Sequence, residues 1–344
     1  KVLARAEGFC TDCPPPSPQT AGGRPTGVSA PGMGKDKIRT TASKEAMRWA
    51  GGEEAPIARG PSNVGNDFDI RMRNEPDGVK AADKITDIIK HCGVCVCEAN
   101  APPELLYAAC EEAEQLWEDG HFGPPLRVSD DRAMLEAQVW NQALEDEEKV
   151  VWIRDMGSKS LQTMNALKLL AKNIADFSGG LSQMLHKEMG VEFDRYGHAM
   201  LSCYTGDRQY NLHIDNPHGE EDDDCCIPDN GMRLTSTYFI NVHWNPAEDG
   251  QGGGLDIHLT DPKDKPESMA TARKAPKLRV APHADTLVLL LSERMAHQVI
   301  RTQGKTRWFA LTLWSLHGAS MQQMTRKLLA MRRQAQRCED SDDD

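Results

Sequence analysis

The segment Tyr-Asn-Leu-His-Ile-Asp-Asn-Pro-His, residues 210–218, decides the fold of this chain. It reads as a short strand that ends in a turn, and His213 and Asp215 stand two residues apart on it. Because side chains at i and i+2 of a strand point to the same face, an imidazole nitrogen and a carboxylate oxygen converge there. The pair therefore predicts a metal site on one face of a β structure.

A third metal ligand is expected far downstream, after most of a β barrel has been built. His297, in Arg-Met-Ala-His-Gln-Val-Ile (294–300), is well placed for it. Two histidines and one carboxylate that leave one face of the metal open are typical of non-haem Fe(II) oxygenases. The sequence therefore predicts an Fe(II) site made by His213, Asp215 and His297, with no catalytic side chain beyond the metal centre.

A cation follows this ligand set at the start of an apolar strand. Arg307 opens Arg-Trp-Phe-Ala-Leu-Thr-Leu-Trp (307–314), ten residues after His297. A guanidinium can hold a carboxylate through two parallel hydrogen bonds. Arg307 is therefore the candidate partner of the distal carboxylate of 2-oxoglutarate.

Short strands separated by turn residues dominate the chain after residue 197. A helical block at 79–91, 102–119 and 158–190, with a short helix at 131–144, precedes them, and strands are expected at 93–98 and 150–154. This order predicts a mainly β fold with supporting helices (α+β), a double-stranded β-helix or jelly roll, which leaves a ligand-sized hollow between its sheets. The eight strands are expected at 198–204, 210–215, 233–242, 254–259, 277–281, 286–292, 297–301 and 307–315.

Composition changes along the chain indicate three parts. Residues 1–78 are rich in Gly, Pro, Ser and charge without sustained periodicity, so we expect them to be disordered. Residues 79–318 form the expected dioxygenase domain, with the jelly-roll core at about 197–316. Residues 319–344 are expected to form a basic amphipathic helix and an acidic tail.

The overall composition narrows the class of partner. The formal net charge of −12 argues against a general nucleic-acid binder, and no apolar run is long enough to cross a membrane. Ten cysteines are scattered without a disulfide or zinc pattern, which favours a reducing compartment, the cytoplasm or nucleus. We expect a monomer.

Several segments resemble the hypoxia-inducible-factor prolyl hydroxylases and their microbial relatives, in the prolyl 4-hydroxylase superfamily. The resemblance covers about 80–317 and diverges near 119–149, where the relatives close a loop over a peptide substrate. It implies Fe(II), 2-oxoglutarate, O₂ and ascorbate as cofactors or cosubstrates. The matching segments are Ala-Met-Leu-Ser-Cys-Tyr-Thr-Gly (199–206), His-Ile-Asp-Asn-Pro (213–217), Thr-Tyr-Phe-Ile-Asn-Val-His-Trp (237–244) and Gly-Gly-Gly-Leu-Asp-Ile (252–257).

The resemblance also assigns roles around the metal. It implies that Tyr204 and Thr312 contact 2-oxoglutarate with Arg307. Phe239 stands where the relatives carry a tyrosine that hydrogen-bonds 2-oxoglutarate, so one donor is missing here. Candidates for lining the substrate pocket are Trp314, Leu255 and Phe239.

One departure from the relatives concerns the last strand. The relatives usually have six residues from the arginine to the closing tryptophan, whereas Arg307 to Trp314 is seven. If the strand keeps the relatives' register, Trp308 takes the place of the arginine and Arg307 points away, unless a bulge intervenes. We assume the bulge because a buried dicarboxylate needs a cation, with Lys305 and Arg301 as alternatives.

Three functions remain open on the sequence. The first is a peptidyl-prolyl 4-hydroxylase acting on a proline-containing protein or peptide. The second is a 2-oxoglutarate oxygenase acting on another residue or a small molecule. The third is a catalytically silent jelly-roll binding module, against which the intact ligand set argues. Two other histidines are given no metal role: His218 is expected in a surface loop, and His283 begins an H-x-D pair too close to His297.

Overall fold

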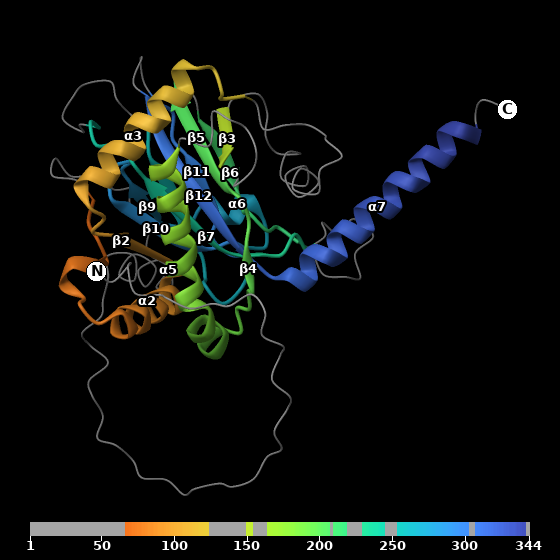
Figure 1. The fold of residues 1–344 in the computed structure, drawn as a ribbon. Coiled ribbons are helices and arrows are strands. Elements are labelled where there is room, and N and C mark those ends of the chain that lie inside the picture. The colour runs from red at the N-terminus through yellow and green to blue at the C-terminus, as the bar shows by residue number, and fades with distance from the viewer. Residues whose placement is uncertain are drawn as a thin grey trace, which may run out of the picture.

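The computed structural model describes residues 66–123, 149–153, 164–206, 209–218, 229–244, 253–302 and 307–341. Two β-sheets face each other, and a layer of helices covers the outer face of the larger sheet (Figure 1). This is the predicted jelly roll with supporting helices. The predicted short helix at 131–144 lies outside the described residues.

The larger sheet has eight strands in the described residues. Seven of them lie side by side across the sheet, and the eighth, β4 (Arg195–Tyr196), pairs with the end of β12. Its strands are largely buried, because one face packs on the helices and the other on the smaller sheet. The order along the sheet is β1 (Ile70–Arg71), β2 (Val94–Glu98), β10 (Thr286–Leu291), β7 (Met232–Phe239), β12 (Arg307–Leu316), β5 (Ala199–Thr205) and β3 (Lys149–Ile153).

The smaller sheet carries both histidines of the predicted metal site. Its β11 and β6 are antiparallel, and His297 pairs directly with His213 in their register. Residues opposite each other in a ladder share a face, so both imidazoles point into the space between the sheets. The order is β6 (Tyr210–His213), β11 (His297–Val299), β8 (Leu255–His258) and β9 (Lys277–Val280).

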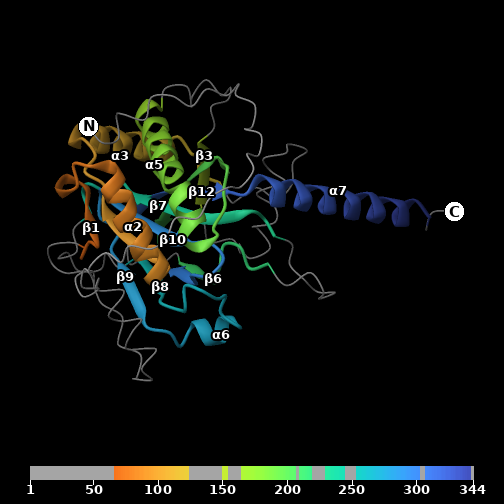
Figure 2. The same cartoon turned by 90° about the horizontal axis from the view of Figure 1, so that it is seen from below.

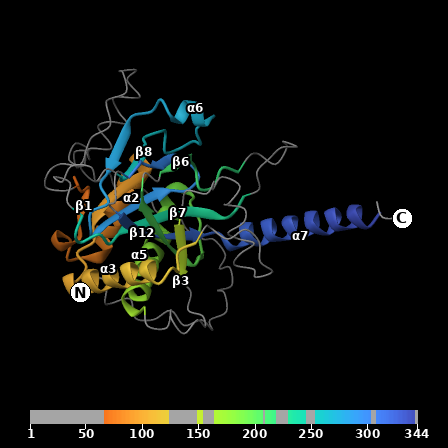
Figure 3. The same cartoon turned by 90° about the horizontal axis from the view of Figure 1, so that it is seen from above.

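Three helices form the outer layer, as seen from the two other directions in Figures 2 and 3. Each is amphipathic and turns its apolar side to the sheet, and a hydrogen bond of 2.8 Å between Ser178 and Ser236 ties the third helix to β7. Asp77 caps the first helix, and Gly93 ends it in the left-handed conformation. They are α2 (Gly78–Cys92), α3 (Pro103–Glu118) and α5 (Asn165–Met189).

Strand β12 shows which side chains face the interior space between the two sheets, where the sequence predicts the hollow. Trp308 lies opposite Tyr204 and Thr312 opposite Thr237, and Trp314 on the same face reaches Asp215. Phe309 and the other alternate residues therefore face the helical layer. The only register shift of β12 falls at its far end, between Ser315 and Leu316.

The described part of the chain begins at residue 66, before the domain boundary at residue 78 that the sequence indicates. Asn66 is buried, where its amide donates to the Ala281 carbonyl at 2.9 Å and its oxygen accepts from the Ala281 N–H at 2.7 Å. Ile70 and Met72 belong to the hydrophobic core. The predicted boundary at residue 78 is therefore wrong for residues 66–77, whose short strand β1 and 3₁₀ turn η1 (Met72–Asn74) lack a long periodic signal. Residues 1–65 lie outside the described ranges.

Two elements near the C-terminal half complete the fold. The short helix α6 (Met269–Ala272), which the sequence does not predict, begins at Ser268, whose hydroxyl caps the Thr271 N–H. Helix α7 (Gly318–Ser341) packs by Met321 and Met324 and then extends away from the body (Figures 1 and 3). Within the described ranges, no helix has the length and apolar character needed to span a bilayer.

Candidate metal centre

His213, Asp215 and His297 converge between the two sheets, as the H-x-D spacing predicts. One ligand atom from each lies within 4.8 Å of the others. The Nε2 atom of His213 is 3.3 Å from Asp215 Oδ1, and that of His297 is 3.7 Å from the same oxygen. Asp215 and His297 are buried, and His213 is partly exposed. The three atoms thus form one facial set of metal ligands.

Backbone carbonyls fix which ring nitrogen faces the site. Nδ1 of His213 donates to the Asn211 carbonyl at 2.8 Å, and Nδ1 of His297 donates to the Met295 carbonyl at 3.1 Å. Each ring therefore carries its proton on Nδ1 and presents the lone pair of Nε2. A second hydrogen bond of this kind orients a metal-binding histidine and makes it more basic.

Two donors hold the second oxygen of Asp215. Oδ2 accepts from the Thr235 hydroxyl and, at 3.2 Å, from the Trp314 indole. Thr235 is in turn hydrogen-bonded to Ser292 at 2.8 Å. Oδ1 is therefore the oxygen left to bind a metal. The sequence reasoning missed Thr235, although it shares a strand face with Thr237 and Phe239, which could have revealed it.

The protonation states of the site suit a cation. Burial alone would raise the pKa of Asp215, but the neighbouring His297, His213 and Thr235 outweigh it and hold the pKa well below its usual range. Burial, reinforced by His213, lowers the pKa of His297 to about 4. At neutral pH the site therefore holds a carboxylate beside a neutral imidazole, the forms that bind metals. Because the donors are two nitrogens and one oxygen on one side, the site fits Fe(II).

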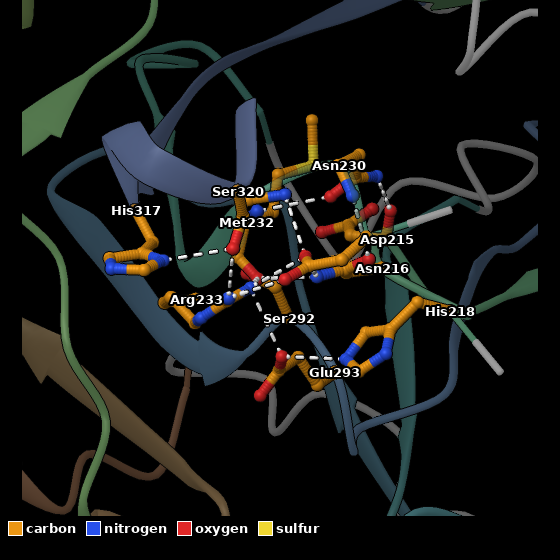
Figure 4. A network of polar contacts seen from close by, with 12 residues as sticks. Asp215, Asn216, His218, Asn230, Met232, Arg233, Ser292, Glu293, His317 and Ser320 are labelled. Carbon is orange, nitrogen blue, oxygen red and sulfur yellow. Dashed lines mark hydrogen bonds and ion pairs between the residues drawn. The ribbon is translucent and has the colours of Figure 1, made fainter. Parts of the chain in front are cut away.

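The turn after Asp215 is fixed by a polar network (Figure 4). The Asn230 amide donates to the Asp215 carbonyl at 2.8 Å, and the Asn216 amide donates to Asp229 at 2.8 Å. Arg233 closes the turn with two bonds to Asp229, of 2.9 and 2.7 Å. The backbone that presents the metal carboxylate is thus held by residues up to 18 positions downstream of it.

A second cluster of possible ligands, His218, Asp229 and Glu293, lies beside this turn. Glu293 accepts from His218 at 2.9 Å and forms an ion pair with Arg233 at 3.1 Å (Figure 4). Lys265 Nζ lies 2.7 Å from the His218 ring. The positive charges of Arg233 and Lys265 already offset the two carboxylates of the cluster. We therefore interpret it as an ion-pair network rather than a second metal site. His218 lies in a loop as predicted, but its side chain is engaged rather than free at the surface.

Arg307 does not lie with the metal ligands. Its Nε donates to Glu114 of α3 at 2.6 Å, and its guanidinium lies over the Trp117 ring. No bulge interrupts β12 between Arg307 and Trp314, so alternation places Arg307 on the helical face. The assumed bulge, and with it the placement of Arg307 in the pocket, is therefore wrong.

Trp308 occupies the inner-face position instead. Its ring stacks on Tyr204 with the centroids 4.5 Å apart and meets Phe239 edge-on at 5.8 Å. All three rings are buried. The expected inward orientation of Tyr204 and Phe239 is therefore observed, and these side chains form an aromatic cluster in the hollow.

The remaining predicted residues are placed as follows. Thr312 faces the hollow and is hydrogen-bonded to Thr237 at 3.2 Å. Leu255 is buried opposite Val299 in the smaller sheet. Trp314 lies beside the metal ligands and holds Asp215, rather than standing apart as a pocket wall. Among the alternatives to Arg307, Arg301 is exposed after β11 and Lys305 lies outside the described residues.

The H-x-D pair formed by His283 and Asp285 has a structural role. Asp285 accepts from the Tyr238 hydroxyl at 2.8 Å and from the backbone N–H groups of Asn100 and Ala101. Its carboxylate therefore fixes the loop after β2 on the helical side of the sheet. Tyr238, on the opposite face from Phe239, cannot replace the missing inner-face donor.

Comparisons with known proteins agree with this geometry. A family model described as the 2OG-Fe(II) oxygenase superfamily matches residues 199–316, which contain all three predicted ligands. No curated protein matches the sequence. Among solved structures, the chain is similar to a prolyl hydroxylase of Trichoplax adhaerens, determined with a peptide fragment of the hypoxia-inducible-factor oxygen degradation domain. The identity is 19%, the match covers 72% of this chain and 94% of that chain, and the TM-score is 0.52.

Two further solved structures are similar at lower TM-scores. A prolyl-4-hydroxylase of Pseudomonas putida has 16% identity, with 69% of this chain and 98% of that chain covered and a TM-score of 0.45. The α-ketoglutarate-dependent epimerase SnoN of nogalamycin biosynthesis has 12% identity, with 70% and 83% covered and a TM-score of 0.45. The likeness to the Trichoplax structure shows a shared jelly-roll fold.

Proposed function

We propose that this chain, whose residues 199–316 belong to the 2OG-Fe(II) oxygenase superfamily, hydroxylates prolyl residues of a protein or peptide. The observation that carries the oxygenase activity is the facial ligand set with both imidazole tautomers fixed. The choice of proline rests on the resemblance to prolyl hydroxylases in the segments around the metal ligands.

Nε2 of His213, Oδ1 of Asp215 and Nε2 of His297 would hold the iron. Iron with 2-oxoglutarate and O₂ supplies the chemistry, in which a C–H bond becomes C–OH while 2-oxoglutarate leaves as succinate and CO₂. One oxygen atom goes to the substrate and the other to succinate, so the atoms balance. No protein base is required.

The protein's own contribution is position and shelter. The Nδ1 bonds of the two histidines and the Oδ2 bonds of Asp215 preset the ligands, so little reorganisation is needed when the metal binds. Burial of Trp308, Phe239 and Leu255 keeps the inner part of the hollow apolar. A water-poor site of this kind protects a strong oxidant from side reactions.

The oxygenase activity is tested by CO₂ release from labelled 2-oxoglutarate with Fe(II) and ascorbate. Incubation with a proteome-derived peptide library, followed by mass spectrometry, then identifies the substrate. A gain of one oxygen on proline supports the proposal, whereas the same gain on another residue or a small molecule supports the second function. Absence of metal-dependent CO₂ release under all conditions would leave only a silent binding module.

A further inference from the structure

We propose that this oxygenase does not select 2-oxoglutarate over 2-oxo acids with an uncharged side chain. The structural basis is that Trp308, rather than a cation, occupies the inner face of β12 beyond Thr312. This inference rests on the proposed oxygenase function and concerns the cosubstrate of the same site. A 2-oxo acid binds iron through its carboxylate and keto oxygens, so the two kinds of acid differ only at the distal end.

The polarity of the hollow falls with distance from the metal ligands. Next to Asp215 on the larger sheet come the hydroxyls of Thr312 and Thr237, which are bonded to each other. Beyond them lie Ala310 and the aromatic cluster of Tyr204, Phe239 and Trp308. The facing strands of the smaller sheet present mainly apolar side chains there, with Tyr210 opposite Val299 as the polar exception. The apolar residues are Leu255, Ile257, Leu278, Val280 and Val299.

Three arginines on the described strands are engaged elsewhere. Arg307 is paired with Glu114 on the helical face, and Arg279 is paired with Asp256 at 2.8 Å on the outer face of the smaller sheet. Arg233 lies on the other side of Asp215 from Trp308 and is bound to Asp229 and Glu293. In the part of the chain that the structure describes, a distal carboxylate beside Trp308 would thus meet no unpaired buried cation.

Trp308 is locked in this place. Its indole N–H donates to the Thr302 hydroxyl at 2.9 Å, and its ring is 1% exposed. A Cβ built on Gly253 would lie 2.5 Å from the Trp308 Nε1 atom, so the backbone of Gly253 closes over the ring. The ring therefore cannot swing aside to admit a cation from the helical side.

These contacts decide which distal group the hollow favours. A carboxylate moved from water to an apolar site without a charge partner loses its hydration and gains little in return. The negative face of an aromatic ring adds repulsion. An uncharged side chain carries neither penalty and packs on the same rings, so discrimination in favour of the dicarboxylate is lost.

The test is direct binding to the full chain loaded with Mn(II) without oxygen, measured by isothermal titration calorimetry. The ligands are 2-oxoglutarate and 4-methyl-2-oxopentanoate, which shares the chelating end and lacks the distal charge. We expect a preference for 2-oxoglutarate below about tenfold, whereas a buried ion pair would give about 100-fold or more. A preference above about tenfold in the unmodified protein overturns the inference.

Two variants test whether Trp308 sets the preference between the two 2-oxo acids. Trp308→Arg places a guanidinium on the inner face and should shift the preference toward 2-oxoglutarate by about tenfold or more. The matched control Arg307→Gln, next to it on the opposite face, should leave the preference unchanged. If Trp308→Arg does not fold, the ratio in the unmodified protein still decides.

Two other outcomes separate this inference from the proposed function. If the unmodified protein prefers 2-oxoglutarate strongly and Arg301→Gln or Lys305→Gln removes that preference, another cation reaches the distal carboxylate. The inference is then wrong and the oxygenase function stands. If neither 2-oxo acid binds the metal-loaded protein, both the proposed function and this inference are wrong.

Discussion

Trp314 donates its indole N–H to Oδ2 of Asp215 at 3.2 Å, and so joins the last strand of the barrel to a metal ligand 99 residues earlier. Thr235, on the neighbouring strand, donates to the same oxygen. The metal carboxylate is therefore oriented by the larger sheet, although the two histidines come from the smaller one. Much of what can be tested follows from this division.

Loss of any protein ligand should abolish turnover. His213→Ala, Asp215→Ala or His297→Ala each leaves two ligands, too few to hold Fe(II). Asp215→Glu keeps the charge but moves the oxygen by one methylene, so most activity should be lost. Metal content by atomic absorption and CO₂ release are the measurements, and circular dichroism should show an intact fold. More than a few per cent of residual activity in an alanine variant contradicts the assignment.

The donors to Oδ2 should control metal affinity. Thr235→Val keeps the shape of the side chain but removes its hydroxyl, so the affinity for Fe(II) should fall about 10- to 100-fold. Competition with a fluorescent chelator measures it. Thr86→Val is the matched control, because its buried hydroxyl in α2 has no hydrogen-bond partner among the residues that the structure describes. Equal effects of the two substitutions would mean that the Thr235 bond does not support the metal.

The metal-free protein should lose stability as the pH falls from about 6.5 to about 4. The pKa of His297 is about 4 in the folded state and about 6.5 in a free chain, so between these values the unfolded chain binds more protons. The free energy of unfolding should fall by up to about 3 kcal/mol over this range. The lowered pKa of Asp215 acts only below about pH 4, where its protonation in the unfolded chain begins.

Urea unfolding at several pH values checks this prediction. His297→Gln is the control, since it keeps a polar side chain of similar length but cannot titrate. Its unfolding midpoint should depend less on pH than that of the unmodified protein, while the buried His258 contributes equally to both. Identical pH profiles would contradict the prediction.

Arg307 should matter for stability rather than for cosubstrate binding. Arg307→Gln should lower the free energy of unfolding by at most about 1 kcal/mol, because the pair with Glu114 is about one-third exposed. Glu114→Gln should cost a similar amount, and the double variant should cost less than the sum. Urea unfolding of the three variants measures the coupling. A large rise in the apparent KM for 2-oxoglutarate in Arg307→Gln would show that its guanidinium reaches the pocket.

The N-terminal boundary can be tested by two truncations. Removal of residues 1–65 should leave metal-dependent decarboxylation intact. Removal of residues 1–75 also takes away Asn66, Ile70 and Met72, so it should destabilise the domain by several kcal/mol. Thermal melts of both proteins decide. Equal melting temperatures would mean that the first strand contributes nothing to the core.

Most of the barrel could be predicted because its strands are short, apolar and separated by turns. The metal ligands were predictable from the H-x-D spacing and the distant His297, although β6 ends at His213 and Asp215 lies in the bend that follows it. The role of Arg307 was not, because it depends on a register that only pairing with β5 and β7 determines. Thr235 was missed because its partner Asp215 lies 20 residues away, in the bend after β6.

The metal ligands are held by both sheets, so a bound metal would link the smaller sheet to the larger one. The imidazoles belong to β6 and β11, whereas the carboxylate is fastened to β7 and β12 through Thr235 and Trp314. A bound ion would therefore link the two sheets through its ligands. Its free energy of binding would add to the free energy needed to separate the sheets. We therefore expect removal of the metal to lower the free energy of unfolding as well as to stop turnover.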